Sequence, residues 1–329
     1  MKRQFGNIAL WQWAVTIILA LGCVSAASAQ TWPSRPVTLI YPFSAGGGGD
    51  MTARLLAAEL GKAWNQTVIV ENRPGGSGML GYAAMKGGRP DGYLMSFIHN
   101  GLTVVRRIAD PEFTGDVGRD YEAVDVVFEN PIQFASHPSA PFKSAKEFVS
   151  YVRANPGKVN ISMGGIGSAD HIVLEMFKQQ SGLDFVIVNY NGAAKQVQGT
   201  LAGEAHAIWT SIALQQYVDS GQLVPLGVSV ASKPTYLKDW PTLSEVGFAN
   251  LYPFITWVGL FAPPKTPREI IQKVNQSLRV IYSEPEVRRR ALTAGVLVGA
   301  TPEETASRIR NEIQQVGPAV KKLGLKFGT

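Results

Sequence analysis

The stretch that decides the fold is VTLIYPFSAGGGGD, at residues 37–50. Its first five residues are rich in β-branched and aromatic side chains, and they predict a strand that Pro42 ends. From Met51 to Trp64, apolar residues recur at the spacing of a helix. This part of the chain is therefore predicted as a strand, a glycine-rich loop and a helix, the order typical of α/β proteins.

The same unit occurs again further along the chain. A strand at 159–162, a glycine loop at 164–168 and a helix at 170–180 repeat it. A third glycine-rich turn, at 73–78, follows a short strand at 68–70. The remaining predicted elements are strands at 93–98, 185–188, 207–210, 226–230 and 257–261, a short helix that ends at 86, and helices at 144–154, 193–201, 267–283 and 302–316.

We expect two α/β lobes, each with a mostly parallel sheet flanked by helices, because strands that alternate with helices form βαβ units. A length of 329 residues suits two domains of about 150 residues each. Residues 30–128 and 230–329 form the first predicted lobe, and residues 129–229 form the second, inserted into the first. The predicted crossings lie near 128–130 and 229–231.

Composition places the chain among folded globular proteins. It is 45% hydrophobic and 17% charged, with a mean hydropathy of +0.03. These values exclude the disordered, collagen-like and coiled-coil classes. The formal net charge of +6 is mild, and the longest basic run, Arg288–Arg290, is typical of a solvated helix face rather than a nucleic-acid patch. No nucleic-acid partner is expected.

The first 29 residues have the pattern of a secretory signal peptide. A cationic start at Lys2 and Arg3 precedes an apolar run from Ile8 to Val24, and small residues end it at Ala29, where we place the cleavage. The alternatives are a retained membrane anchor and a lipidated N-terminus at Cys23. The signal peptide predicts export to the periplasm.

No cofactor or metal is expected. The one cysteine lies in the predicted signal peptide, so the mature chain has no thiolate ligand and no disulfide. The spacing of the histidines does not give a paired metal-binding motif. They are His99, His137, His171 and His206.

The glycine loops are the candidate binding elements. A glycine turn between a strand and a helix leaves several backbone N–H groups without partners, and the helix dipole adds positive potential at the same point. Phe43 to Asp50 and Met163 to His171 each form such a turn, one in each predicted lobe. Ligands of α/β sheets collect at the carboxyl ends of strands, so the two loops, with the turn at 73–78, predict an anion-binding cleft.

Some side chains near these loops have two interpretations. Asp50 is predicted first as the N-cap of the following helix. Ser168 could cap the second helix or donate to a ligand carboxylate, and His171 could contact the ligand or lie partly exposed. Most aromatic residues at strand ends, Tyr190 among them, are core by default. Trp257 is the aromatic residue that we expect nearest the cleft.

An exported enzyme stays open as an alternative, with Asp50, His99 or His171 as its reactive group. The sequence contains neither a Gly-x-Ser-x-Gly elbow nor a phosphate loop that ends in Gly-Lys-Ser/Thr. The dinucleotide-binding pattern also fails, because Met51 and Thr52 stand where it needs glycine. A catalytic pair within hydrogen-bond reach would favour a hydrolase or dehydrogenase, and a pocket lined by amides would favour a receptor.

An ordered series of short motifs resembles one family over essentially the whole mature chain. The motifs are PFSAGGGGD at 42–50, VENRPGGSG at 70–78, PDGY at 90–93, ANPGK at 154–158, GIGS at 165–168, NYNGAA at 189–194, WPTLSEVG at 240–247 and WVGLFAP at 257–263. The chain is similar here to the extracytoplasmic solute receptors of tripartite tricarboxylate transporters, also called Bug-type receptors.

The resemblance implies a periplasmic binding protein of type II-like, two-lobed architecture that closes on a small organic carboxylate. Such a receptor delivers its ligand to a two-component membrane permease; an orphan receptor that acts in signalling is the remaining alternative. We also expect the chain to be a monomer without a cofactor. The implied ligand-binding residues are Phe43, Ser44, Ala45, Gly47, Asp50, Gly75, Gly76, Gly78, Gly165, Gly167, Ser168 and His171, to which we add Tyr190, Asn191 and Trp257.

The chain departs from the family pattern beside the predicted pocket. Asn191 stands where the family usually has Lys or Arg, and Lys195 follows in the next helix. His206 replaces a common Asp, and residues 99–102 replace a small polar stretch. These departures leave the identity of the carboxylate open.

Overall fold

The structure, a computed structural model, describes residues 32–166, 168–190, 192–229, 237, 239–246, 255–292 and 295–323. Its first sheet has the strand order β11-β4-β10-β3-β1-β2. The bounds are β1 Val37–Tyr41, β2 Val68–Asn72, β3 Leu94–His99, β4 Glu122–Asn130, β10 Thr256–Ala262 and β11 Val296–Leu297.

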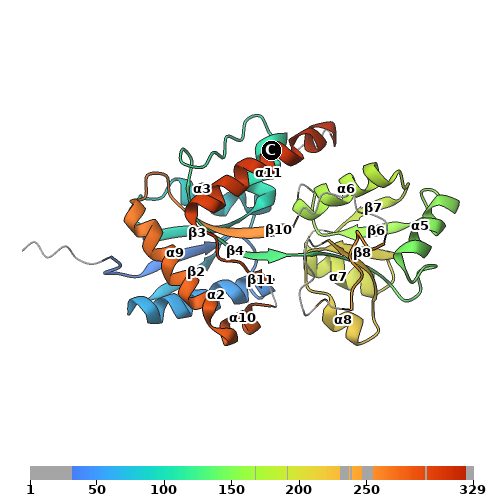
Figure 1. Cartoon of the computed structure of the whole chain (residues 1–329), viewed down its shortest axis with the longest axis horizontal. Helices are drawn as coiled ribbons and strands as arrows, with labels where there is room; N and C mark the ends of the chain where they lie inside the picture. Colours follow the sequence, from blue (N-terminus) through green and yellow to red (C-terminus); the bar gives the residue numbers. More distant parts are fainter. Residues whose placement is uncertain are drawn as a thin grey trace, which may run out of the picture. The chain divides into compact units, whose positions relative to one another are not determined.

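Helices cover both faces of this sheet. Figure 1 shows α3 and α11 on one side and α2, α9 and α10 on the other. A π-helical turn, η3, follows β3 and packs against α11. The bounds are α2 Gly48–Trp64, η2 Gly76–Gly78, α3 Met79–Lys86, η3 Gly101–Arg106, α4 Arg107–Ala109, α9 Arg268–Ser283, α10 Pro285–Ala291 and α11 Pro302–Leu323.

The second sheet has the order β7-β6-β8-β5-β9. Figure 1 shows α6 on one side of it and α7 on the other. The bounds are β5 Ile132–Ser136, β6 Asn160–Met163, β7 Val186–Asn189, β8 Ala207–Thr210, β9 Val224–Ser229, α5 Ala145–Ala154, α6 Ala169–Ser181, α7 Ala193–Leu201 and α8 Gln215–Asp219.

The chain changes sheets at Pro131, the one residue between β4 and β5. β5 enters the second sheet opposite the carboxyl end of β8, with Gln133 paired to Thr210, and therefore runs antiparallel to it. β10 returns beside the last residue of β4 and runs antiparallel to β3 and β4. Both sheets are therefore mixed, rather than mostly parallel as we had expected, and parallel pairing among the described strands is limited to β2-β1-β3 and β7-β6-β8. The carboxyl ends of these parallel strands lie at the edges next to the crossing. The second predicted crossing, at 229–231, extends beyond the described residues.

Aromatic side chains form the core of the second lobe. The ring of Phe134 on β5 meets Phe148 at a centroid distance of 5.0 Å and Trp209 at 5.4 Å. Phe177 on α6 stacks on Trp209 at 5.2 Å. All four side chains are fully buried. This packing holds α6, the helix that follows the second glycine loop, against β5 and β8.

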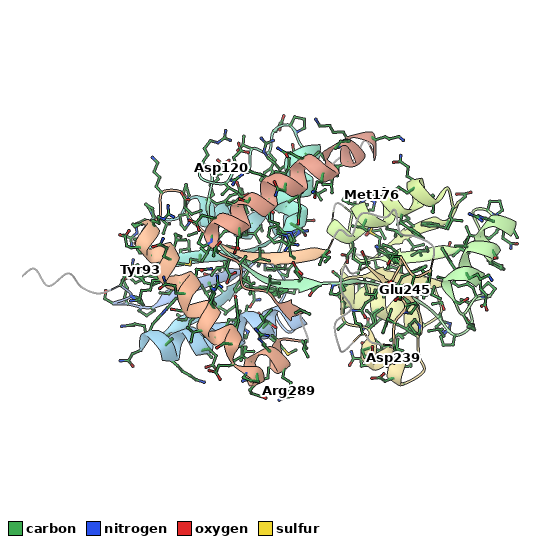
Figure 2. All side chains as sticks on the ribbon, viewed as in Figure 1. Tyr93, Asp120, Met176, Asp239, Glu245 and Arg289 are labelled. Carbon is green, nitrogen blue, oxygen red and sulfur yellow. The ribbon has the colours of Figure 1, made fainter. Side chains whose placement is uncertain are left out.

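The surface helix α10 carries the basic run of the sequence. Figure 2 labels Arg289 there, and its guanidinium pairs with Glu286 at 2.7 Å, both side chains being well exposed. Among the described residues, no helix combines the length and the apolar character needed to cross a bilayer. Residues 1–31, which include the predicted signal peptide and Cys23, lie outside the described residues.

Candidate ligand-binding site

The first glycine loop connects β1 to α2. The helix begins at Gly48, and Gly47 occupies the N-cap position without a side-chain cap. Among the described residues, no group accepts a hydrogen bond from the N–H of Ser44, Ala45 or Gly47. The loop is exposed. It therefore presents free amide donors beside the positive end of a helix dipole.

Asp50 does not cap α2, contrary to the prediction, because the helix begins two residues earlier and places Asp50 inside its first turn. Its carboxylate accepts hydrogen bonds from Gly46 N–H at 3.0 Å, Arg54 Nε at 3.0 Å and Asn72 Nδ2 at 2.8 Å. Burial alone would raise the pKa of Asp50, but these bonds outweigh it and lower the pKa. Asp50 thus stabilises the loop through its hydrogen bond with the Gly46 N–H.

The second turn of this lobe follows β2, which lies beside β1 with Asn72 opposite Tyr41. Gly75, Gly76 and Gly78 have φ angles of 138°, 55° and 93°, and the intervening Ser77 also has a positive φ of 52°. Residues that carry a Cβ rarely adopt positive φ angles, which explains why glycine occupies most of this turn. The turn lies at the same sheet edge as the first loop.

His99, at the end of β3, connects the two turns. Its Nε2 lies 3.0 Å from the carbonyl oxygen of Ser77, which only accepts, so Nε2 carries the proton. Burial lowers the pKa of His99, and the bond to Ser77 opposes this only in part. The ring of Phe43 packs on the imidazole at a centroid distance of 5.4 Å.

The loop of the second lobe connects β6 to α6. Ser168 is the N-cap of α6, and its hydroxyl oxygen accepts from His171 N–H at 3.2 Å, which leaves its own proton available to a ligand. Gly165 and Ile166 have no acceptor for their N–H groups among the described residues. The predicted site residues Gly167 and Asn191 lie outside the described residues.

Asp170, in the first turn of α6, connects this loop to the first sheet. One carboxylate oxygen accepts from the N–H and hydroxyl of Ser211, at 2.9 and 3.0 Å, and the other accepts from the hydroxyl of Thr256 at 2.9 Å. Burial raises the pKa of Asp170 despite these bonds. Since Thr256 is the first residue of β10, the bond joins the two lobes next to their glycine loops.

Two further predicted site residues lie on α6 and after β7. His171 is buried, with Nε2 3.6 Å from Glu175 Oε1. Burial lowers the pKa of His171, and Glu175 offsets this only in part. The hydroxyl of Tyr190 donates to Glu204 at 3.0 Å, and its ring lies against Gly199 of α7.

Trp257, the aromatic residue that we expected nearest the cleft, is fully buried in this structure. It is 0% exposed, and its indole N–H donates to both carboxylate oxygens of Glu312 on α11 at 2.9 Å. Arg308 also donates to Glu312, at 2.8 Å, and pairs with Glu129 near the end of β4. This polar network stabilises both strands that lead to the second lobe.

Sequence reasoning missed several polar side chains that hold the turns in place. They are Arg54 and Asn72 in the first lobe, Ser211 in the second and Thr256 between them. Asn72 gave a usable signal, because it ends a strand parallel to β1, whereas the contact of Thr256 with Asp170 spans 86 positions and has no local signature.

Among the described residues, the three groups of the enzyme alternative do not pair with one another. Asp50 bonds to Arg54 and Asn72, His99 to Ser77, and His171 lies beside Glu175. Within the part of the chain that the structure describes, no cluster of three or more His, Cys, Asp or Glu side chains could hold a metal ion. The arrangement offers backbone donors for an anion.

Comparison with known proteins gives a consistent result. Residues 52–325 match the family described as tripartite tricarboxylate transporter family receptor. Protein BugT of Bordetella pertussis is 29% identical over 314 residues, which cover 94% of this chain and 96% of BugT.

Two solved structures share the fold. Rpa4515 of R. palustris with adipate has a TM-score of 0.81 at 28% identity, covering 89% of this chain and 99% of that one. MatC of Rhodopseudomonas palustris with bound malate has a TM-score of 0.76 at 25% identity, covering 88% and 100%. The predicted two-lobed fold of periplasmic binding proteins is confirmed.

Proposed function

The chain belongs to the tripartite tricarboxylate transporter receptor family, and from that premise we propose that it binds a small organic carboxylate between its two lobes. The observation that carries the proposal is the pair of glycine loops with free amide donors. They lie at the two sheet edges next to the crossing, beside the Asp170–Thr256 bond. The family and fold are those of solute-binding receptors.

In this proposal the N–H groups of the main chain bind the negatively charged carboxylate of the ligand. Amides of the first loop and of the turn at 75–78 hold the ligand carboxylate from one lobe, and the loop around Ser168 holds it from the other. Contacts made only when the lobes approach shift the population toward a closed form. That form is what a membrane permease would recognise.

The cellular setting is part of the same proposal. A signal peptide cleaved after Ala29 would export the chain to the periplasm, where relatives of this family act. The receptor would work there as a monomer and deliver its ligand to a two-component permease. No cofactor takes part.

The test is a substitution that covers the first loop without disturbing the fold. A Cβ at Gly47 meets nothing within 4 Å, and its φ is not positive, so Gly47→Val is accommodated. Its side chain would cover the neighbouring amides. We expect binding of carboxylates such as adipate and malate, measured by calorimetry, to weaken by about tenfold or more, which is about 1.4 kcal/mol.

The matched control is Gly87→Val, at the far end of α3, where a Cβ makes ordinary contact with Ala83. It should leave both affinity and thermal midpoint unchanged. A Gly47→Val protein that binds as tightly as the control would contradict amide recognition at this loop. If no carboxylate raises the thermal midpoint of the unmodified protein, the proposed function itself is contradicted.

A further inference from the structure

We propose that the preferred ligand carries a single carboxylate on an apolar body, an aliphatic or aromatic monocarboxylate rather than a dicarboxylate. This inference rests on the proposed function and specifies the ligand class of the same site. It follows from the side chains that surround the amide donors.

Exposed apolar side chains gather at the glycine turns. Phe43 is 36% exposed, Met51 49%, Leu80 58% and Ile166 59%. They lie in the loop after β1, in the first turns of α2 and α3, and in the loop after β6. Half of the exposed large apolar side chains of the described residues are therefore found at these turns, in both lobes. Exposed apolar groups concentrated at one place mark a binding surface.

In the first lobe two of these side chains lie close to the turns. Phe43 packs on His99, which contacts Ser77 of the second turn. Leu80 covers Gly75 so closely that a Cβ there would lie 2.6 Å from its Cδ1. A ligand whose carboxylate meets the amides would therefore place its remaining atoms against an aromatic ring and a leucine.

The two arginines near the turns of the first lobe already have partners. Arg54 bonds to Asp50 and Asn72, and Arg73 pairs with Glu71 at 2.6 Å. The buried histidines have lowered pKa values and are uncharged at neutral pH.

The second lobe adds an acid beside its loop, the carboxyl of Asp170, whose bonds come from uncharged hydroxyl and amide groups. A second ligand carboxylate would have to use Lys195 on α7, an exposed side chain with no ion-pair partner among the described residues. In this proposal the amides hold one carboxylate, and the exposed apolar side chains beside them favour an uncharged remainder of the ligand.

The experiment compares ligands of equal length. Hexanoate and adipate differ only by a second carboxylate, and hexanamide lacks the charge altogether. We expect calorimetry to give hexanoate at least tenfold tighter binding than adipate, with no binding of hexanamide. Adipate that binds as tightly as hexanoate or more tightly overturns this inference but leaves the proposed function intact. If neither acid binds, this inference falls, and the proposed function falls with it only when no other carboxylate raises the thermal midpoint.

A pair of variants locates the apolar contact. Ile166→Ser should weaken hexanoate binding at least fivefold. The control is Val280→Ser, because Val280 is 66% exposed on α9, an element that carries none of the turns. Equal affinities of the two variants for hexanoate would overturn the assignment of Ile166 to the ligand surface.

Discussion

Asp125 lies in the middle of β4, and its side chain has no exposed surface. One of its oxygens accepts from Ala300 N–H at 2.7 Å. Burial raises the pKa of Asp125 to about 8, although the bond from the Ala300 N–H and the positive charge of Arg279 oppose the rise. The group is therefore protonated in the folded protein at pH values where it is ionised in the unfolded chain.

The sign of the resulting pH dependence follows from this raised pKa. The contribution of Asp125 to stability is complete below about pH 4, the unfolded pKa, and is lost as pH rises toward 8. The free energy of unfolding should fall by about 1.4 kcal/mol per pH unit from this group over that range. The isosteric Asp125→Asn variant should lack this contribution.

Urea denaturation of both proteins at pH 5, 6, 7 and 8 provides the measurement. The stability of Asp125→Asn relative to the unmodified protein should increase steadily across the series, because other titrating groups are common to both. A constant difference between the two proteins would show that Asp125 is ionised in the folded state.

At the scale of elements, β1 and α2 meet where the Tyr41 side chain packs on Gly49. A Cβ on Gly49 would lie 1.9 Å from the hydroxyl oxygen of Tyr41 and 2.9 Å from the ring carbon that carries it. We expect Gly49→Ala to cost roughly 1–3 kcal/mol of unfolding free energy through this overlap. The cost should be smaller in a Tyr41→Phe background, because the nearest atom is then absent.

A double-mutant cycle of these two substitutions, measured by denaturation, separates this overlap from other effects. The coupling free energy should favour the double variant. Additive effects would mean that Gly49 is required for a reason other than its distance from Tyr41.

The elements with clear periodicity were predictable from the sequence. The helix at 193–201 and the strand at 207–210 have the predicted bounds, and the other predicted elements differ mainly at their ends. The strands β4 and β5 were not predicted, because acidic residues interrupt the apolar pattern of β4 and Pro131 separates the two. An alternation of apolar and polar residues identifies a strand that is buried on one face. In β4, however, the polar residue Asp125 is buried as well as the valines.

The glycine loops of the candidate site could be predicted from the sequence, whereas the contacts of the side chains around them could be predicted less well. Glycine turns have a local signature, so both loops could be placed from the sequence. The position of Trp257 could not, because its partner Glu312 lies 55 residues away on α11. The role of Asp50 also depends on a distant residue, Asn72, whose side-chain amide donates a hydrogen bond to its carboxylate.

At the scale of the whole molecule, the Asp170–Thr256 hydrogen bond gives a test of coupling between lobe approach and binding. Thr256→Val keeps the shape of the side chain and removes the donor at 2.9 Å. A hydrogen bond contributes about 0.5–1.5 kcal/mol, so ligand affinity measured by calorimetry should fall by up to about tenfold.

Ser211→Ala is the control, since it removes a donor at 3.0 Å from the same carboxyl but within the second lobe. This variant should lower stability with little effect on affinity. If Ser211→Ala weakens binding as much as Thr256→Val, the carboxyl acts by shaping its own loop and the coupling between lobes is absent.

The donors of the glycine turns belong to the main chain, and this has a consequence for how such a receptor diverges. A peptide N–H does not titrate under physiological conditions, and no mutation except one to proline deletes it. Homologues can exchange most of their side chains, acquire new solutes and inhabit acidic or alkaline surroundings while the means of holding an anion passes unchanged from ancestor to descendant.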